Sequence, residues 1–328
     1  MISTMIVCDI CRTRSAQFLQ HHTRKRVCKT CFENDIVSRV RDTIKRFNMI
    51  SEGDKILVAV SGGKDSLTLL DILANLIDNN KLVALSIIEG ISGYNREADI
   101  ASVRRITRMY GIDYLVVSLR DFIGYSVDDF MYAQQKLKIR SPLSACTFCG
   151  IARRRVMNSI AREIGATKIA TGHNLDDEIQ TYIINILRGD IVRLIQSHPL
   201  STPHSHSLVK RIKPLRYVYE YETTIYAYIK GFHFQDTECP YINQRPTLRA
   251  KIRSMLVEIE SKSPGILLNL IRYLDTVIEP LVLKYQRESI TLPQCIKCGE
   301  PTSPKRTVCK FCTLVDLIIQ AIKVREHC

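Results

Sequence analysis

Residues 55–66, which read Lys-Ile-Leu-Val-Ala-Val-Ser-Gly-Gly-Lys-Asp-Ser, constrain the fold more than any other stretch. Residues 55–60 form a short β-branched run of the kind found in a parallel sheet that is covered on both faces. Gly62 and Gly63 have no Cβ, so backbone N–H groups can approach an anion there, and a helix from about Lys64 points its positive dipole end at the same place. The stretch therefore predicts a phosphate-binding loop between a central strand and a helix. Its spacing matches neither a Walker loop nor a dinucleotide fingerprint.

Strand and helix patterns alternate after this loop. Strands are expected at 82–88, 114–118 and 168–171, and helices at 67–77, 97–109 and 125–138. This alternation predicts an α/β fold with a doubly wound parallel sheet, in which ligands bind outside the carboxyl ends of the strands. Further helices are expected at 35–47, 220–229, 245–260, 266–286 and 314–324.

The charge of the chain favours a polyanionic partner. The 328 residues include 47 Lys and Arg against 33 Asp and Glu, a formal net charge of +14, and we place nucleic acid ahead of an acidic membrane surface. No apolar run approaches the roughly 18 residues needed to span a bilayer, and the first residues do not form a signal peptide. We therefore expect a cytoplasmic protein without a membrane partner.

Eight of the 12 cysteines form two pairs of C-x-x-C motifs near the ends of the chain. In a large cytosolic chain such pairs indicate metal or redox chemistry rather than disulfides. Each set suits one tetrahedral Zn(Cys)4 site. The expected ligands are Cys8, Cys11, Cys28 and Cys31 for the first site, and Cys295, Cys298, Cys309 and Cys312 for the second. Basic residues surround both sets, where they form either a solvated surface or phosphate contacts.

A third C-x-x-C pair, Cys146 and Cys149, has no second pair near it in the sequence. A thioredoxin-like dithiol and a metal site completed from far along the chain both fit this pair. The arginines at 153–155 are expected on the first turns of the following helix. Cys239 by itself is more typical of a small buried hydrophobic residue than of a ligand.

Two further segments follow predicted strands, and so are expected at the same sheet edge as the glycine loop. Residues 89–94 read Glu-Gly-Ile-Ser-Gly-Tyr, and residues 172–178 read Gly-His-Asn-Leu-Asp-Asp-Glu at a helix start. Acidic residues in a first helical turn ordinarily complement the helix dipole. At the carboxyl end of a strand, an aspartate can also hold the magnesium ion of ATP.

Residues 196–207 interrupt the periodic pattern and are predicted to form an exposed loop. His198, His204 and His206 in this loop have no regular spacing, so we attribute them to loop polarity rather than to metal binding.

The motifs together resemble the tRNA 2-thiouridine synthetases of the TtuA, TtcA and Ctu type. The Ser-Gly-Gly-Lys-Asp-Ser sequence resembles the pyrophosphate loop (PP-loop) of ATP pyrophosphatases, whose fold is HUP-like. The other matching motifs are Glu-Gly-Ile-x-Gly-Tyr at 89–94, Cys-x-x-Cys-Gly at 146–150, Gly-His-Asn-x-Asp-Asp at 172–177, Leu-Arg-Gly-Asp at 187–190, Glu-Cys-Pro at 238–240 and the two terminal ribbons. The resemblance spans nearly the whole chain. It implies an N-terminal zinc ribbon (1–34), a PP-loop catalytic domain with a helical C-terminal part (35–290), and a C-terminal zinc ribbon with a terminal helix (291–328).

The resemblance also assigns roles to residues. Cys146, Cys149 and Cys239 correspond to three ligands of a [4Fe-4S] cluster whose fourth iron stays open, because three thiolates satisfy three irons. Asp65, Asp177 and Arg153 correspond to the catalytic positions, with magnesium near Asp65 or Asp177. In some relatives a lysine stands where this chain has Arg153, which can act only as a fixed cation. The implied ATP-binding residues are Ala59, Ser61, Gly62, Gly63, Lys64, Asp65, Ser66, Ile87, Arg153 and Gly172.

The implied function is ATP-dependent thiolation of tRNA. The uridine O2 is adenylated, and sulfur from the cluster then replaces the activated oxygen to give 2-thiouridine. The Asn-Leu-Asp-Asp-Glu sequence at 174–178 and the Pro264-Gly265 pair are more similar to the TtuA side of the family, which acts on uridine 54 of the T loop (5-methyluridine), than to the side that acts on wobble uridine 34. The implied sulfur donor is a ubiquitin-like protein with a C-terminal thiocarboxylate, and the implied assembly is a homodimer.

Two alternatives are left open by the sequence. One keeps the adenylation but replaces the cluster with a persulfide on Cys146, Cys149 or Cys239. The other is a zinc-ribbon RNA-binding adaptor whose nucleotide site is regulatory. A set of three cysteines beside a phosphate loop argues against the adaptor, because binding alone does not require it.

Overall fold

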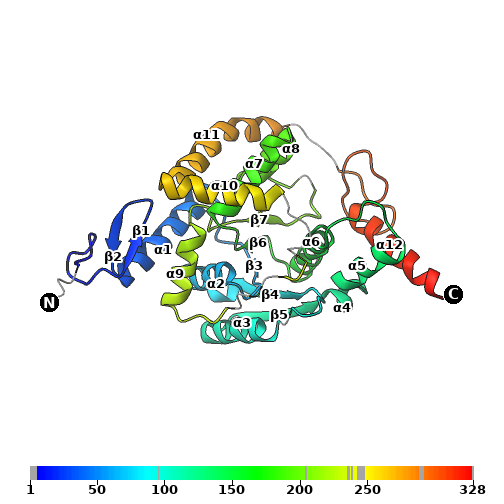
Figure 1. Cartoon of the computed structure of the whole chain (residues 1–328), viewed down its shortest axis with the longest axis horizontal. Coiled ribbons are helices and arrows are strands. Elements are labelled where there is room, and N and C mark those ends of the chain that lie inside the picture. The colour runs from blue at the N-terminus through cyan, green and yellow to red at the C-terminus, as the bar shows by residue number, and fades with distance from the viewer. Residues whose placement is uncertain are drawn as a thin grey trace.

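A five-stranded, fully parallel sheet forms the centre of the molecule (Figure 1). The computed structural model describes residues 6–94, 96–203, 205–234, 237, 239–241, 248–287 and 292–326. The strand order is β5 (Asp113–Ser118), β4 (Leu82–Ile88), β3 (Ile56–Ala59), β6 (Lys168–Thr171) and β7 (Lys210–Ile212). The chain builds outward from β3 to β5 and then continues on the other side of β3. The strand order therefore reverses between β3 and β6, as the predicted doubly wound fold requires.

Successive residues of β3 enter different hydrophobic cores. Ile56 and Val58 belong to one core and Leu57 to the other, since side chains alternate between the two faces of a strand. The first core is completed mainly by α1 (Lys29–Arg46), α2 (Lys64–Leu76), α3 (Glu97–Tyr110), α7 (Leu175–Leu187), α8 (Ile191–Ser197), α9 (Glu220–Ile229), α10 (Leu248–Lys262) and α11 (Ile266–Arg287). The second is completed by α4 (Leu119–Ile123), α5 (Val127–Lys136), α6 (Ala145–Glu163) and α12 (Lys310–Glu326). Helices on both faces explain why the central strands β3 and β4 are buried and almost entirely apolar.

Most predicted elements are confirmed, and the differences concern short segments and boundaries. The strands at 82–88 and 168–171 and the helix at 220–229 have their predicted bounds. The strand β7 was not predicted, because it has only three residues and two of them are basic. Helices α4 and α8, of five and seven residues, were not predicted either.

Several helices begin earlier than their sequence patterns predict, among them α12, which starts at Lys310 rather than at residue 314. Helix α1 starts at Lys29 rather than at residue 35, so Cys31 lies in its first turn and the helix continues without a break from the cysteine module into the core. Helix α6 starts at Ala145, so Cys146 and Cys149 lie in its first turns and Arg153 lies further along the same helix. The prediction that the arginines would occupy the first turns was wrong.

The prediction for the histidine-containing loop was wrong for His198. This residue follows α8 and is only 2 % exposed, with its ring edge-on to Phe47 and its Nε2 atom 3.9 Å from Asp275 Oδ1. Burial lowers the pKa of His198 to about 4, so the ring is neutral near pH 7. It is a core residue rather than a polar loop residue. His206 is exposed, and His204 lies outside the described residues.

The two terminal cysteine modules lie at opposite ends of the long axis, with the sheet between them (Figure 1). The N-terminal module contains the hairpin of β1 (Phe18–Gln20) and β2 (Lys25–Val27), and the C-terminal module leads into α12. In the described part of the chain, none of the helices combines the length and the apolar character that crossing a membrane requires.

A buried ion network joins the sheet to the helical layer. Arg216 is fully buried and donates hydrogen bonds to Glu178 of α7, to Asp275 of α11 and, over 2.9 Å, to the Tyr182 hydroxyl. The Tyr217 hydroxyl donates a further hydrogen bond to Asp275 Oδ2 over 2.6 Å. Buried charges of this kind are tolerated only when every partner is present.

Replacing Arg216 with methionine is expected to lower the free energy of unfolding by about 3–5 kcal/mol, because Glu178 and Asp275 keep their burial but lose their shared cation. Urea unfolding followed by circular dichroism measures the change. Lys262→Met is the matched control, since its ion pair with Glu258 is 72 % and 67 % exposed and contributes less than about 1 kcal/mol. Equal losses in the two variants would contradict this account of the network.

Candidate active site

The glycine loop lies at the carboxyl edge of β3, where the chain leaves Ala59 and enters α2 at Lys64. Hydrogen bonds within the loop fix its shape: Ser61 N donates to Ser66 Oγ over 3.1 Å, and Ser66 Oγ donates to Gly63 O over 2.9 Å. Among the described residues, no side chain caps the N-terminus of α2. The N–H groups of its first turn are therefore available to an anion, and the helix dipole favours negative charge there.

Two glycines allow the backbone to pack closely around this loop. Gly62 has φ +84°, and a Cβ at this position would lie 2.4 Å from Asp99 Cβ. Gly172 follows β6, and a Cβ on it would lie 3.0 Å from Ser66 N and 3.1 Å from the carbonyl carbon of Asp65. The ends of β3 and β6 therefore meet at the start of α2, at the point where the strand order reverses.

Lys64 and Asp65 are held by residues from α7 and α9. Lys64 Nζ lies 3.2 Å from Asp65 Oδ2 and 3.1 Å from Glu220 Oε1. Burial lowers the pKa of Lys64, but the carboxylates of Asp65 and Glu220 outweigh burial and raise it, so the lysine stays charged. Asp65 Oδ1 accepts hydrogen bonds from Asn174 over 3.1 Å and from Thr223.

The acidic cluster at the start of α7 faces the same edge. Burial raises the pKa of Asp177 to about 6, with the negative charge of Asp65 adding to this effect and Arg249 opposing it. Burial also raises the pKa of Asp176 to about 6, and Asp176 Oδ2 accepts a hydrogen bond of 2.8 Å from the Glu220 N–H. Asp177 caps the helix together with Asn174. The negative charge of Asp65 thus acts on the Asp177 carboxyl group. Two neighbouring carboxylates are suitable ligands for Mg²⁺.

Helix α10 provides two cations to these carboxylates. Arg249 Nη1 lies 3.5 Å from Asp177 Oδ1, and Arg253 Nη2 contacts both carboxylate oxygens of Glu220 at 3.0 Å. Both arginines lie in the helix that the sequence predicts at 245–260. Their ion pairs join residues more than 30 positions apart and leave no local signal in the sequence.

Cys146, Cys149 and Cys239 lie near one another beside this edge. Burial raises the pKa of Cys149 to about 11, and the negative charges of Glu89, Cys146 and Cys239 add to this effect while Arg153 opposes it. Burial also raises the pKa of Cys239, with Cys146 and Glu89 contributing. Glu89 directly follows β4, so the three thiols and the glycine loop share one end of the sheet.

The three sulfurs are spaced too widely to share one tetrahedral ion. In the two terminal sets all Sγ atoms lie within 4.8 Å of one another, whereas these three cysteines form no such group within the described residues. A cubane accommodates wider spacing, because each thiolate binds its own iron. The other eight described cysteines belong to the terminal sets, so no fourth described cysteine completes this one. The donor set therefore fits a [4Fe-4S] cluster with one iron free of protein thiolate.

Arg153 lies between the cysteines and Glu89. Its Nε atom is 3.7 Å from Glu89 Oε1, and its charge acts on the Cys149 thiol. Arg96 binds the same glutamate, with Nη1 3.2 Å from Glu89 Oε2, and also donates to the Ser61 carbonyl. Glu89 and Arg96 therefore link the glycine loop to the cysteine set. Sequence reasoning placed residues 89–94 at this edge but did not identify either contact.

Ile87 is the predicted ATP-binding residue whose side chain lies in the core. It is 6 % exposed and packs in the second hydrophobic core, so only its backbone can meet a ligand at the edge of the sheet. Ala59, the residues of the glycine loop and Gly172 lie together at this edge.

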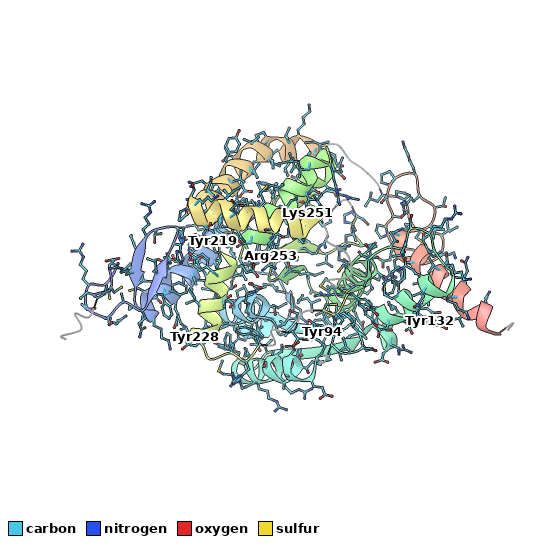
Figure 2. The ribbon with its side chains drawn as sticks, viewed as in Figure 1. Tyr94, Tyr132, Tyr219, Tyr228, Lys251 and Arg253 are labelled. Carbon is cyan, nitrogen blue, oxygen red and sulfur yellow. The ribbon has the colours of Figure 1, made fainter. Side chains whose placement is uncertain are left out.

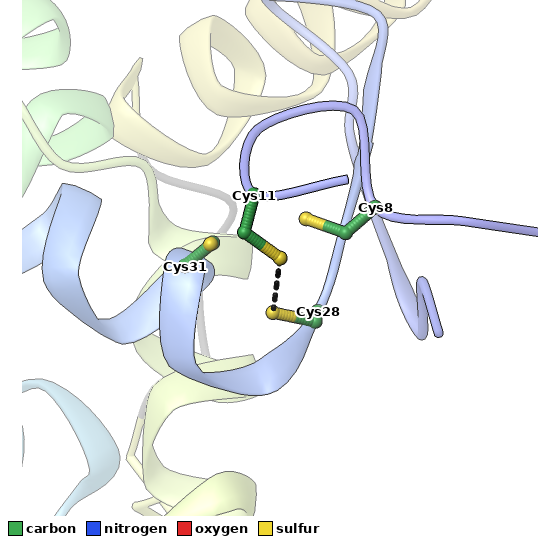
Figure 3. Close-up of side chains that lie close together, drawn as sticks. All are labelled: Cys8, Cys11, Cys28 and Cys31. Atoms are coloured by element: carbon green, nitrogen blue, oxygen red, sulfur yellow. Dashed lines mark hydrogen bonds between the residues drawn. The ribbon is translucent and has the colours of Figure 1, made fainter. Parts of the chain in front are cut away.

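The two terminal sets have the geometry of tetrahedral metal sites. Figure 3 shows the N-terminal set. Four thiolates at about 2.3 Å from one zinc ion lie about 3.8 Å apart. Cys11 Sγ is 3.9 Å from Cys28 Sγ, and Cys298 Sγ is 3.7 Å from Cys309 Sγ. Hydrogen bonds from Thr13 lower the pKa of Cys11 to about 5, whereas burial raises the pKa of Cys31, so it is the sulfur spacing that indicates a metal site. Both sets can therefore hold a metal ion.

The C-terminal module is attached to the helix that carries Cys146 and Cys149. Glu300 of this module lies 2.6 Å from Arg155 Nη1 and also pairs with Arg162, both on α6. Phe311 packs under the Arg155 guanidinium, 6.0 Å from ring centre to Cζ. The module therefore supports the position of α6.

Comparison with known proteins gives a consistent result. A family model described as PP-loop domain matches residues 33–259. The "Cytoplasmic tRNA 2-thiolation protein 1" of Candida glabrata is 31% identical over 316 residues, which cover 94% of this chain and 85% of that protein. The protein of the same name from Chlamydomonas reinhardtii is 35% identical over 315 residues, covering 94% of this chain and 84% of that protein.

A solved structure is similar over almost the full length. The "U34-tRNA thiolase NcsA from Methanococcus maripaludis with its [4Fe-4S] cluster" superposes with a TM-score of 0.73 at 28% sequence identity. The match covers 96% of this chain and 97% of that chain. The similarity therefore includes both terminal modules as well as the sheet.

Replacing Gly172 with alanine is expected to weaken binding of MgATP about tenfold. The added methyl group would press on the backbone of Ser66 and Asp65, and overpacking of this kind costs about 1–3 kcal/mol. Isothermal titration calorimetry measures the affinity. Gly53→Ala is the matched control, because a Cβ at Gly53 meets no described atom within 4 Å, and we expect it to bind MgATP like the wild type. Wild-type affinity in Gly172→Ala would contradict the proposed role of this contact.

Proposed function

Because the chain belongs to the PP-loop family and, within it, to the tRNA 2-thiolation enzymes, we propose that it makes 2-thiouridine in tRNA by adenylation and sulfur transfer at the carboxyl edge of its sheet. The observation that carries the proposal is the shared position of the glycine loop, the Asp65 and Asp177 carboxylates and three cysteines. The glycine loop and the two carboxylates can hold a triphosphate, and the three cysteines can supply sulfur chemistry.

The first step consumes ATP. The uridine O2 attacks the α-phosphorus, the bond to the β-phosphate oxygen breaks, and pyrophosphate leaves while the N3 proton is released. The backbone N–H groups of residues 62–66 bind the leaving pyrophosphate, and Lys64 exchanges Glu220 for a phosphate oxygen. Asp65 and Asp177 would hold a magnesium ion, which would neutralise charge on the phosphates.

The second step replaces the activated oxygen. Sulfide adds to C2, the bond from C2 to the adenylated oxygen breaks, AMP leaves, and the sulfur-bound proton returns to N3. When bound, a [4Fe-4S] cluster supplies a Lewis-acidic iron that carries the sulfide. Cys146, Cys149 and Cys239 would hold it. Arg153 keeps a fixed positive charge beside these thiols and near Glu89, where it stabilises the negative charge of the departing phosphate.

We propose wobble uridine 34 as the target. The sequence motif favours uridine 54, and the geometry of the site does not distinguish the two positions. The similarity of almost the whole chain to a U34-tRNA thiolase supports the alternative. The formal charge of +14 is consistent with contacts to the tRNA backbone at either position.

Further parts of the proposal concern metals, partners and location. Zinc is proposed for both terminal sites, since four thiolates at this spacing match its preferred geometry.

A ubiquitin-like protein with a thiocarboxylate is proposed as the sulfur donor, and a homodimer as the assembly, because the family that the chain resembles has both. The names of the relatives support a cytoplasmic location. The division into parts at 1–34, 35–290 and 291–328 is also a proposal.

Replacing Cys28 with serine is expected to lower the zinc content from two ions per chain to one, because a tetrahedral site that loses one of four thiolates binds zinc weakly. Mass spectrometry of the metal content of the purified protein measures the stoichiometry. Cys239→Ser serves as control and should retain both ions. Two tightly bound ions in Cys28→Ser would contradict the N-terminal assignment.

The function is tested by incubating anaerobically purified protein with tRNA, MgATP and sulfide, digesting the RNA and identifying thiolated nucleosides by mass spectrometry. We expect 2-thiouridine at position 34. Lys64→Ala and Cys149→Ser should each lower the rate by about a hundredfold or more, because each removes a group that acts on the reacting atoms. Lys262→Met, with its exposed ion pair, is the control.

Three results would contradict parts of the proposal. Thiolation at position 54 alone would restore the target that the sequence motif favours. A colourless, iron-free preparation with full activity would favour a persulfide mechanism. Full thiolation in both Lys64→Ala and Cys149→Ser would favour an RNA-binding adaptor.

A further inference from the structure

An open groove lies along α5, beside the three-cysteine set. Its cavity volume is about 560 Å³. Residues from α5, from the turn that follows it and from the segment after Cys239 line the groove, among them Asp128, Met131, Tyr132, Gln135, Lys138 and Tyr241. None of the roles proposed above uses these side chains.

Hydrogen bonds hold both walls of the groove in place. On one side, the buried Gln134 side chain donates to Leu143 O over 3.0 Å and accepts from Leu143 N over 2.6 Å, which fixes the turn after α5. On the other side, the Tyr241 hydroxyl donates to Asp128 Oδ1 over 2.7 Å. Ser92 N donates to Asp128 Oδ2 over 2.8 Å. The groove is therefore preformed, and a ligand can enter without ordering its walls.

The surface of the groove combines an aromatic ring with positive charge. Tyr132 is 52 % exposed on α5, so part of its ring is accessible to a ligand in the groove. Lys136, Lys138 and Arg140 are exposed along the same segment. The carboxylates nearby are already paired, Asp128 with Tyr241 and Ser92, and Asp129 with Arg120. An exposed ring with cations at its rim is the combination that binds an unpaired base and its phosphates.

The groove opens next to the reacting groups. Tyr241 is two residues after Cys239, and the Asp128 charge acts on the Cys239 thiol. Helix α5 also packs on α6, which carries the other two cysteines. An RNA loop that places its uridine at the cysteines can therefore reach this groove with a neighbouring nucleotide.

We propose that the α5 groove binds the base adjacent to the target uridine, with that base stacked on Tyr132 and its phosphates contacting Lys136, Lys138 and Arg140. The inference rests on the proposed function and adds to it a second nucleotide site, which contributes to the choice of RNA. Such a site holds the loop open while the target base is unstacked, a step that costs a few kcal/mol in other base-flipping enzymes.

The test measures binding of an anticodon stem-loop RNA by fluorescence anisotropy. Tyr132→Ala is expected to raise Kd about tenfold, the loss of one stacked base, and Tyr132→Phe should bind like the wild type because the ring is retained. Tyr228→Ala is the matched control. Tyr228 is 77 % exposed on α9, far from Tyr132 and toward the N-terminal module (Figure 2), so its removal should leave Kd unchanged.

An RNA with an abasic nucleotide next to the target uridine sharpens the test. It should bind the wild type about tenfold more weakly, and Tyr132→Ala should then add no further loss, because the two changes remove the same contact. Equal Kd values for wild type and Tyr132→Ala, or additive losses with the abasic RNA, would overturn the proposal.

Thiolation assays with two sulfur sources separate the groove from the function. With free sulfide, Tyr132→Ala should show a raised KM for RNA at nearly unchanged kcat. A defect that appears only when a thiocarboxylated protein supplies the sulfur would overturn the proposal in favour of a groove for the tail of that protein. Wild-type protein that forms no thiolated nucleoside would contradict the proposed function alone, while the Kd measurements would still decide whether the groove binds a base.

Discussion

The close approach of Gly172 to the first residues of α2 is the constraint on which the site depends. Parallel strands direct their carboxyl ends to one edge of the sheet, and β3 and β6 are neighbours only because the strand order reverses between them. With no side chain at Gly172, the acidic start of α7 lies beside the phosphate-binding start of α2. Backbone packing in the centre of the fold thus brings the carboxylates at the start of α7 next to the glycine loop.

Charge is arranged differently inside the site and over the chain as a whole. The chain carries a net charge of +14, yet the sheet edge contains Glu89, Asp65, Asp177 and Glu220. In this state lysine and arginine side chains neutralise these carboxylates, including Arg249 and Arg253 from α10. The phosphates of a bound nucleotide can replace a carboxylate as the partner of a lysine or arginine, and its magnesium ion can replace a lysine or arginine as the partner of a carboxylate. The positive surface remains free for RNA.

The sequence predicted what is encoded locally. The glycine loop, the strands at 82–88 and 168–171 and the terminal cysteine sets are read from neighbouring residues, and their geometry agrees with the prediction. Contacts between distant segments were not predictable in this way. Glu220 reaches Lys64 across 156 positions because α9 packs on α2, and Arg96 joins the Ser61 carbonyl to Glu89 through the fold alone. Cys239 was connected to Cys146 only by resemblance to a family, since its spacing carries no signal.

The central claim is that ATP and sulfur chemistry meet at one sheet edge. A crystal structure of anaerobically prepared protein with a non-hydrolysable ATP analogue, recorded at the iron absorption edge, tests it most directly. We expect an anomalous peak for iron bound by Cys146, Cys149 and Cys239, facing the α-phosphate of a nucleotide held by residues 61–66, with room for one base between them. Iron bound elsewhere, or a nucleotide on the opposite side of the sheet from these cysteines, would contradict the account.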